Sequence, residues 1–139
     1  MTNQTKFSLK NKLKEFKGVE CGWKYFTFIW CQKVIDGKEE CNGLTDFHTG
    51  FIFLDETMNE DLLHEIILHE LTHIILEVGG IEDGIKVNNE DVVYKVSRGY
   101  RLLARLNPEL MGVLFDGRYF RHSGDDIPDP PHFDTVSVV

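Results

Sequence analysis

The chain has 139 residues, 42% of them hydrophobic and 27% charged, which is the composition of a globular protein with one core. A formal net charge of -8 argues against a nucleic-acid-binding surface, because such surfaces usually carry an excess of lysine and arginine. The first 17 residues are polar and lysine-rich, and no apolar run has the length of a membrane span, so we expect neither a secretory signal nor a membrane partner. Three cysteines without a C-x-x-C pair indicate a reducing compartment, the cytoplasm.

The N-terminal segment predicts a short amphipathic helix over 9–17. Ser8 is a favoured N-cap residue, and apolar residues recur at helical spacing as far as Gly18, where the helix should end. We expect one face of this helix to pack on the core while its lysines remain in solvent.

Extended segments should follow. The stretch 23–35 is dense in aromatic and β-branched residues, and Asp36-Gly37 after it is a turn signal, so we expect one long strand, bent or bulged. Because both of its alternating faces are largely apolar, this strand should be central in a small sheet and covered by helices. The polar stretch 39–49 predicts a loop, and 51–54 predicts a second strand that ends at Asp55.

The longest predicted helix begins after Asn59, a good N-cap residue, with acidic residues in its first turn. It runs to Val78, where Gly79-Gly80 should stop it and turn the chain back. His64 in this helix is expected to be a surface residue.

An H-E-x-x-H motif occupies the middle of this helix. His69 and His73 are four residues apart and share one helix face, so both rings can reach one metal ion, and Glu70 lies beside them as a general base for water activated by zinc. We expect both rings to point into the interior, where the metal would satisfy them; the competing interpretation is two core histidines with separate hydrogen-bond partners. The apolar residues that share the histidine face on a helical wheel are Leu62, Ile66 and Leu76.

A second long helix should follow a polar loop, capped by Asn88 or Asn89 and running to about Leu106, before Asn107-Pro108 ends it. We expect a further short helix over 109–115 and an extended piece over 117–121. The predicted buried side of the second long helix comprises Val92, Val93, Val96, Tyr100 and Leu103.

A catalytic zinc site usually has three protein ligands and one open position. The metzincin extension is excluded, because that motif needs a glycine and a histidine at the positions held here by Leu76 and Gly79. Glu90, at the start of the second long helix, is the preferred third ligand, and Asp91 is the alternative. Glu77, one turn beyond the motif, is expected to contact the metal ligands, without binding the metal itself, or to face solvent.

Four segments of the chain carry a family resemblance: Asn42-Gly43-Leu44-Thr45-Asp46, Phe51-Ile52-Phe53-Leu54-Asp55, Leu68-His69-Glu70-Leu71-Thr72-His73 and Asn89-Glu90-Asp91-Val92-Val93. Together they resemble small phage-encoded zincin-like proteins related to ImmA/IrrE-type metallopeptidases. The resemblance covers about residues 41 to 110, and the H-E-x-x-H motif is its most specific part.

The resemblance implies a minimal gluzincin-like α+β domain, in which a small sheet packs on the metal helix and a second helix carries a glutamate ligand. It implies that zinc is held by His69, His73 and Glu90, with Glu70 as the general base. The accessory tyrosine or histidine that stabilises the oxyanion in gluzincins has no fixed motif here. The candidates for it are Tyr94, Tyr100, Tyr119 and His122.

We therefore expect one zinc ion per chain, held in a single zincin-like domain over 1–122. An acidic, proline-rich tail without regular structure should follow over 123–139. The expected activity is zinc-dependent hydrolysis of peptide bonds in a specific protein of the cytoplasm, the host cytoplasm if the chain is phage-encoded. The alternative is a zincin-fold binding or inhibitor protein that keeps zinc for stability and captures a host partner without cutting it. Hydrolysis of an amide or of another non-peptide substrate at the same site is a third interpretation.

Overall fold

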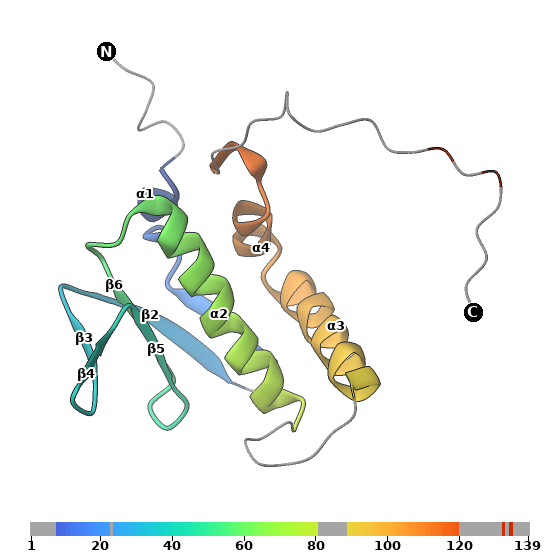
Figure 1. Ribbon diagram of the computed structural model, residues 1–139, viewed down its shortest axis with the longest axis horizontal. Helices are drawn as coiled ribbons and strands as arrows, with labels where there is room; N and C mark the ends of the chain where they lie inside the picture. Colours follow the sequence, from blue (N-terminus) through green and yellow to red (C-terminus); the bar gives the residue numbers. More distant parts are fainter. Residues whose placement is uncertain (1–7, 23, 81–88, 120–131, 133, 135–139) are drawn as a thin grey trace.

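Helix α2 lies across one face of a small mixed sheet, and further helices pack beside it (Figure 1). The structure is a computed structural model that describes residues 8–22, 24–80, 89–119, 132 and 134. The described helices are α1 (Leu9–Leu13), α2 (Glu60–Val78), α3 (Asn89–Leu106), α4 (Pro108–Leu114) and the short 3-10 helix η1 (Gly117–Tyr119). The described strands are β1 (Gly18–Glu20), β2 (Tyr25–Cys31), β3 (Val34–Asp36), β4 (Glu39–Cys41), β5 (Gly43–Asp46) and β6 (Phe51–Asp55). The predicted α+β class is confirmed.

The main sheet has the strand order β1-β2-β6-β5. β2 and β6 pair in parallel, with Trp30 opposite Leu54, whereas β1 and β5 run antiparallel to their neighbours. β5 is therefore an edge strand of this sheet, and α2 packs beside it. β3 and β4 form a separate hairpin, whose turn places Gly37 at a φ of +66°, a conformation that glycine adopts without strain.

Two predictions about the strands are wrong. The strand predicted over 23–35 stops at Cys31, and the chain leaves the main sheet before β3 begins at Val34. The loop predicted over 39–49 contains β4 and β5, which are short, polar and at least partly exposed, so no apolar alternation marks them. The central position of β2 and the strand at 51–54 are confirmed.

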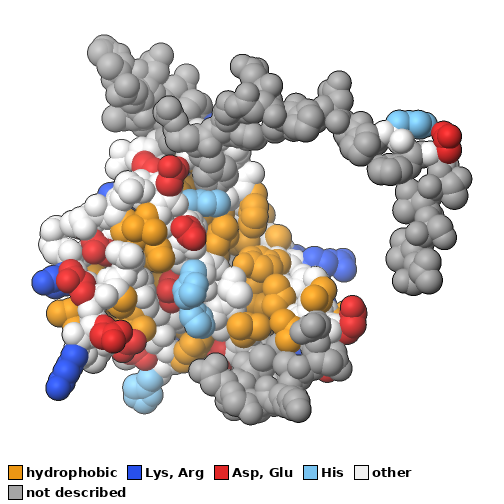
Figure 2. Space-filling model, viewed as in Figure 1, with side chains coloured by type: hydrophobic (Ala, Val, Ile, Leu, Met, Phe, Trp, Pro, Cys, Tyr) orange, Lys and Arg blue, Asp and Glu red, His pale blue; other side chains and the backbone are white. Residues whose placement is uncertain are grey.

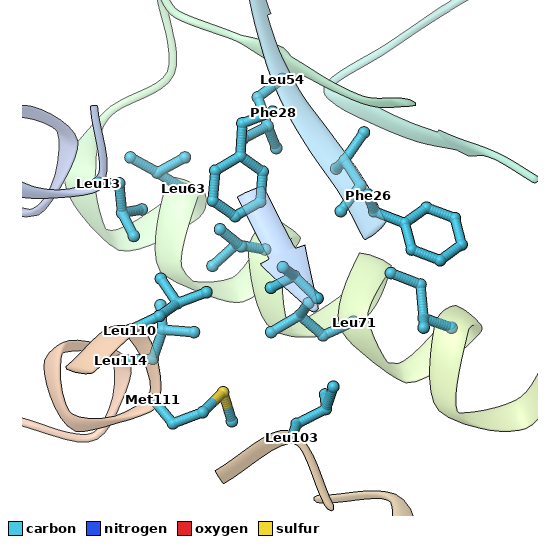
Figure 3. Packing of buried hydrophobic residues seen from close by; sticks show 14 of the residues in the cluster. Leu13, Phe26, Phe28, Leu54, Leu63, Leu71, Leu103, Leu110, Met111 and Leu114 are labelled. Atoms are coloured by element: carbon cyan, nitrogen blue, oxygen red, sulfur yellow. The ribbon is translucent and has the colours of Figure 1, made fainter. Parts of the chain in front are cut away.

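The core lies between the helices and one face of the sheet (Figure 3). On the other face of β2, Tyr25 is 45% exposed, so helices cover one face of this strand and not both as predicted. Burial of a leucine or phenylalanine side chain contributes about 1.5 to 3 kcal/mol, so this cluster holds the helices on the sheet. The labelled core residues are Leu13 of α1, Phe26 and Phe28 of β2, Leu54 of β6, Leu63 and Leu71 of α2, Leu103 of α3, and Leu110, Met111 and Leu114 of α4.

The N-terminal helix is present but shorter than predicted. Ser8 caps it by accepting a hydrogen bond from the backbone N of Asn11 at 3.2 Å, and α1 ends at Leu13. Gly18 belongs to β1 and does not close the helix as predicted. A Cβ at Gly18 would lie 1.9 Å from the carbonyl oxygen of Phe26, so the glycine is required for the close approach of β1 to β2.

Helix α2 has the predicted ends. The side chain of Asn59 accepts a hydrogen bond from the backbone N of Leu62 at 2.8 Å, and the helix stops at Val78 before Gly80, whose φ is +77°. The H-E-x-x-H motif lies in the middle of this 19-residue helix, which contacts strand β5 and helix α3.

Helix α3 spans the predicted residues, but its buried side differs from the prediction. Leu103 is buried, whereas Val93 is 59% exposed. The short helix predicted over 109–115 is confirmed as α4, and the extended piece predicted over 117–121 is wrong for the described residues, which form η1.

The predicted tail over 123–139 lies outside the described residues, apart from His132 and Asp134. None of the helices in the described ranges is long and apolar enough to cross a membrane.

Candidate metal centre

The three functional residues of the motif meet different surroundings on α2. His69 and His73 are exposed, whereas Glu70 is 4% exposed and faces the edge of the sheet at β5. Figure 2 shows histidine side chains at the molecular surface over α2, with hydrophobic side chains beside them over α3. The helix thus presents two imidazoles to solvent and holds a carboxylate under them.

The prediction that both histidines point into the interior is wrong. The wheel residues expected to mark a buried face, Leu62, Ile66 and Leu76, are only half-buried. Because α2 is apolar around much of its circumference, the sequence alone cannot decide which apolar stripe faces the core. The stripe that does so comprises Leu63, Ile67, Leu71, Ile74 and Ile75.

The two histidine rings nevertheless converge. The Nε2 atoms of His69 and His73 lie 3.1 Å apart, with ring centroids 4.7 Å apart and ring planes at 78°. Two imidazole nitrogens bound to one tetrahedral zinc, each at about 2.0 to 2.1 Å, are about 3.3 Å apart, so the observed spacing fits a shared metal. Without a metal, the same contact is a hydrogen bond, in which the Nε2–H of one ring donates to the unprotonated Nε2 of the other.

Glu70 is held by strand β5. The hydroxyl of Thr45 donates a hydrogen bond to Oε1 of Glu70 at 2.7 Å. No hydrogen-bond partner for Oε2 occurs among the described residues, and none of their fully buried side-chain polar atoms is unsatisfied, so Oε2 remains accessible to water. One carboxylate oxygen is therefore fixed, and the other can accept a proton.

Gly43 allows β5 to come this close to α2. A Cβ at this position would lie 2.6 Å from Cγ2 of Ile66 and 3.4 Å from Oε2 of Glu70. Gly43 and Thr45 are two residues apart and lie on the same face of the strand, so the first makes room for the helix and the second reaches its carboxylate. Neither role is predicted from the local sequence, because the contact between Thr45 and Glu70 joins residues that are 25 apart.

On its other side, the motif contacts α3. The hydroxyls of Thr72 and Tyr100 lie 2.6 Å apart, and the hydroxyl of Thr72 donates to the carbonyl oxygen of Leu68 at 2.8 Å. Since Thr72 has only one hydroxyl proton, Tyr100 must donate in the contact between them. Tyr100 is thus positioned beside the motif, whereas Tyr94 is 61% exposed and its ring packs against Arg98.

The structure does not bring Glu90 together with the histidine pair. Glu90 is exposed in the first turn of α3, ten residues before Tyr100, which is level with Thr72; ten residues of α-helix extend about 15 Å. Asp91 and Glu77 are exposed as well. Among the residues that the structure describes, no group of three histidine, cysteine, aspartate or glutamate side chains is arranged to hold a metal.

The remaining candidates have other surroundings. His64 is not the surface residue that was predicted: its Nε2 lies 2.8 Å from the carbonyl oxygen of Leu114 and joins α2 to α4. Burial raises the pKa of the thiols of Cys31 and Cys41 above the usual value. Tyr119 packs partly against the core, and His122 lies outside the described residues.

Comparisons of the chain with protein-family models, with curated proteins and with solved structures found no match.

Proposed function

We propose that this chain is a zinc-dependent metallopeptidase that hydrolyses peptide bonds of a specific protein in the cytoplasm. The observation that carries the proposal is the convergence of the exposed His69 and His73 nitrogens, 3.1 Å apart, next to a carboxylate that strand β5 holds in place. A pair of core histidines would be buried with separate partners, and these two rings are exposed and meet each other.

We further propose a zincin-like, gluzincin-type arrangement for the domain. This is supported by a motif helix that lies beside an antiparallel edge strand and is flanked by a second long helix, α3. An edge strand can pair with an extended peptide through its free backbone groups, and β5 is such a strand immediately beside Glu70.

In the proposed reaction, His69 and His73 hold the metal. Zinc, when bound, polarises a carbonyl group and lowers the pKa of water. Glu70 accepts a proton at Oε2, while Thr45 keeps Oε1 occupied and prevents the carboxylate from rotating away. Among the candidate tyrosines, Tyr100 contacts the motif through Thr72; to donate to developing negative charge on the substrate, it would have to release its hydrogen bond to Thr72.

The third ligand is a separate proposal. Glu90, which the structure does not bring to the histidine pair, is proposed from the sequence, and zinc binding by the Glu90→Ala variant tests it.

Substrate trapping tests the function. The Glu70→Gln variant should retain zinc and hold an uncleaved protein that the wild-type chain cuts, so pull-down from cells should enrich that protein with Glu70→Gln and its fragments with wild type. A His69→Ala, Glu70→Gln double variant is the control that should lose both zinc and the captured protein. If the Glu70→Gln chain binds zinc and keeps its full biological effect in cells, the peptidase proposal fails, and the chain is a binding protein.

A further inference from the structure

A groove of about 600 Å³ lies between α3 and the C-terminal part of α2. Neither histidine of the motif nor Glu70 is among the described residues that line it. Its volume is within the range of ligand-binding sites, about 300 to 1,000 Å³. The groove is thus a second feature of the surface, separate from the candidate metal centre.

One wall of the groove is cationic. It carries four of the 15 lysine and arginine residues of a chain whose net charge is -8, namely Lys95, Arg98, Arg101 and Arg105 of α3. They follow one another at intervals of three or four residues, so they form a row about 15 Å long on one side of the helix. Among the described residues, none of the four is paired with a carboxylate.

The base of the groove is apolar. Ile75 and Val78 of α2 and Leu102 of α3 line it. Gly99 brings the helices together here, because a Cβ on it would lie 2.4 Å from Cγ2 of Ile75. Ile75 is buried and Val78 and Leu102 are half-buried, whereas the three arginines are exposed, so the apolar side chains lie deeper than these charges.

We propose that this groove binds an acidic segment of a partner protein in which carboxylates alternate with apolar side chains. Guanidinium groups bind carboxylates through paired hydrogen bonds. On an otherwise acidic protein, a row of three arginines and one lysine without carboxylate partners among the described residues is complementary to such a segment. A row of about 15 Å matches about five residues of extended chain, at roughly 3.3 Å each, and is longer than one small anion. The apolar base receives the side chains between the carboxylates.

Two other polyanions fit less well. A membrane surface is bound by apolar side chains that project outward, whereas Ile75, Val78 and Leu102 are recessed between two helices. The phosphates of a nucleic acid would be repelled by a chain of net charge -8, and only four cationic side chains in the groove would attract them. A segment with both carboxylates and apolar side chains uses the whole groove.

Binding of a labelled probe peptide tests the proposal without reference to zinc or hydrolysis. The probe is a fluorescein-labelled 12-residue peptide of alternating glutamate and leucine, and fluorescence anisotropy measures its Kd for the full chain. The Arg101→Glu, Arg105→Glu variant should bind it about tenfold or more weakly, because two attractions become repulsions. The matched control, Lys33→Glu and Lys38→Glu on the β3–β4 hairpin, makes the same change in net charge elsewhere and should leave Kd within about twofold.

The Arg101→Gln, Arg105→Gln variant repeats the test without charge reversal, and amide NMR spectra of each variant check that it is folded. Peptides with glutamine for glutamate, or serine for leucine, should bind at least about tenfold more weakly than the probe. Equal weakening by the groove and hairpin variants, or no saturable binding of the probe, overturns the proposal.

Two further probes distinguish the alternative polyanions. A 12-nucleotide oligothymidylate and vesicles of phosphatidylserine and phosphatidylcholine should not bind in a way that depends on Arg101 and Arg105. With the peptide, the backbone amide shifts of Val78 and Leu102 should change. Binding of either other probe that is lost in the groove variant, with no binding of the peptide, reassigns the groove to nucleic acid or lipid and overturns the proposal.

Discussion

Glu70 and the two histidines occupy little more than one turn of the same helix, yet they differ in burial and in hydrogen-bond partners. The carboxylate is buried and bonded to Thr45 of β5, whereas the rings of His69 and His73 are exposed and contact each other. Strand β5 therefore orients the proposed base, whereas the hydrogen-bond contact of the two exposed rings is with each other. This difference predicts that the two kinds of residue respond differently to substitution.

The largest expected effect is on metal content. His69→Ala or His73→Ala should lower bound zinc from one per chain to nearly none, measured by elemental analysis after dialysis, because each removes one of two converging nitrogens. Because both rings are exposed, the free energy of unfolding of each variant in the presence of a chelator should lie within about 0.5 kcal/mol of the parent value. With free zinc at 100 times Kd, the parent alone should gain about 2.7 kcal/mol.

His48→Ala is the matched control for the histidine variants. His48 is exposed in the turn before β6, so its removal should leave zinc content unchanged. Zinc retained at one per chain in both motif variants contradicts a metal shared by His69 and His73.

The next largest effect is on hydrolysis. Glu70→Gln should reduce hydrolysis of the trapped substrate by a factor on the order of 100 or more, because the amide cannot accept the proton. Zinc content and melting temperature should change little, since the glutamine carbonyl oxygen can still accept the hydrogen bond of Thr45. Glu77→Gln, on the exposed side of the same helix, is the control and should leave hydrolysis unchanged. An active Glu70→Gln enzyme would assign the base to another residue.

Zinc affinity also tests the proposed third ligand. Glu90→Ala should weaken zinc binding about tenfold or more, because it removes the proposed third ligand, and Asp91→Ala should change it much less. Competition with a chromophoric chelator measures both constants. The reverse ranking transfers the role to Asp91, and equal affinity for parent and both variants removes α3 as the source of the ligand.

A smaller effect, on the free energy of unfolding, is expected from Thr45 of strand β5. Thr45→Val keeps the shape of the side chain but removes the donor to Oε1 of Glu70, so the free energy of unfolding of the metal-free protein should fall by about 1 to 3 kcal/mol. Thr45→Ser keeps the donor and should recover most of this loss. Urea denaturation measures both variants, and equal stability of Thr45→Val and the parent contradicts the positioning role.

The predictable parts of the fold were those with local signals. Asn59 and Ser8 cap their helices through backbone groups three residues away, and α3 ends just before Asn107-Pro108 as predicted, so the sequence around each was sufficient. β4 and β5 were missed because short polar strands are stabilised by pairing with distant segments and carry no periodic pattern of their own.

The candidate site divides in the same way. The spacing of His69 and His73 predicts that their rings converge, because a helix repeats its face every three or four residues. The direction in which they face was predicted wrongly, since α2 offers more than one apolar stripe. Thr45 and Tyr100 contact the motif from 25 and 28 residues away, a pairing that only the three-dimensional packing of β5 and α3 reveals.

The smallest expected effect concerns the α3 side of the motif. Tyr100 donates to Thr72, which keeps its own donated bond to the carbonyl oxygen of Leu68, so Tyr100→Phe removes one hydrogen bond without leaving Thr72 unsatisfied. The free energy of unfolding should fall by only about 0.5 to 1.5 kcal/mol in urea denaturation, and Tyr94→Phe, whose side chain is 61% exposed, should cost less. Zinc content should stay at one per chain in both variants, because neither hydroxyl is a proposed ligand. If Tyr100→Phe lowers hydrolysis no more than Tyr94→Phe does, Tyr100 only joins the two helices and has no role in the reaction.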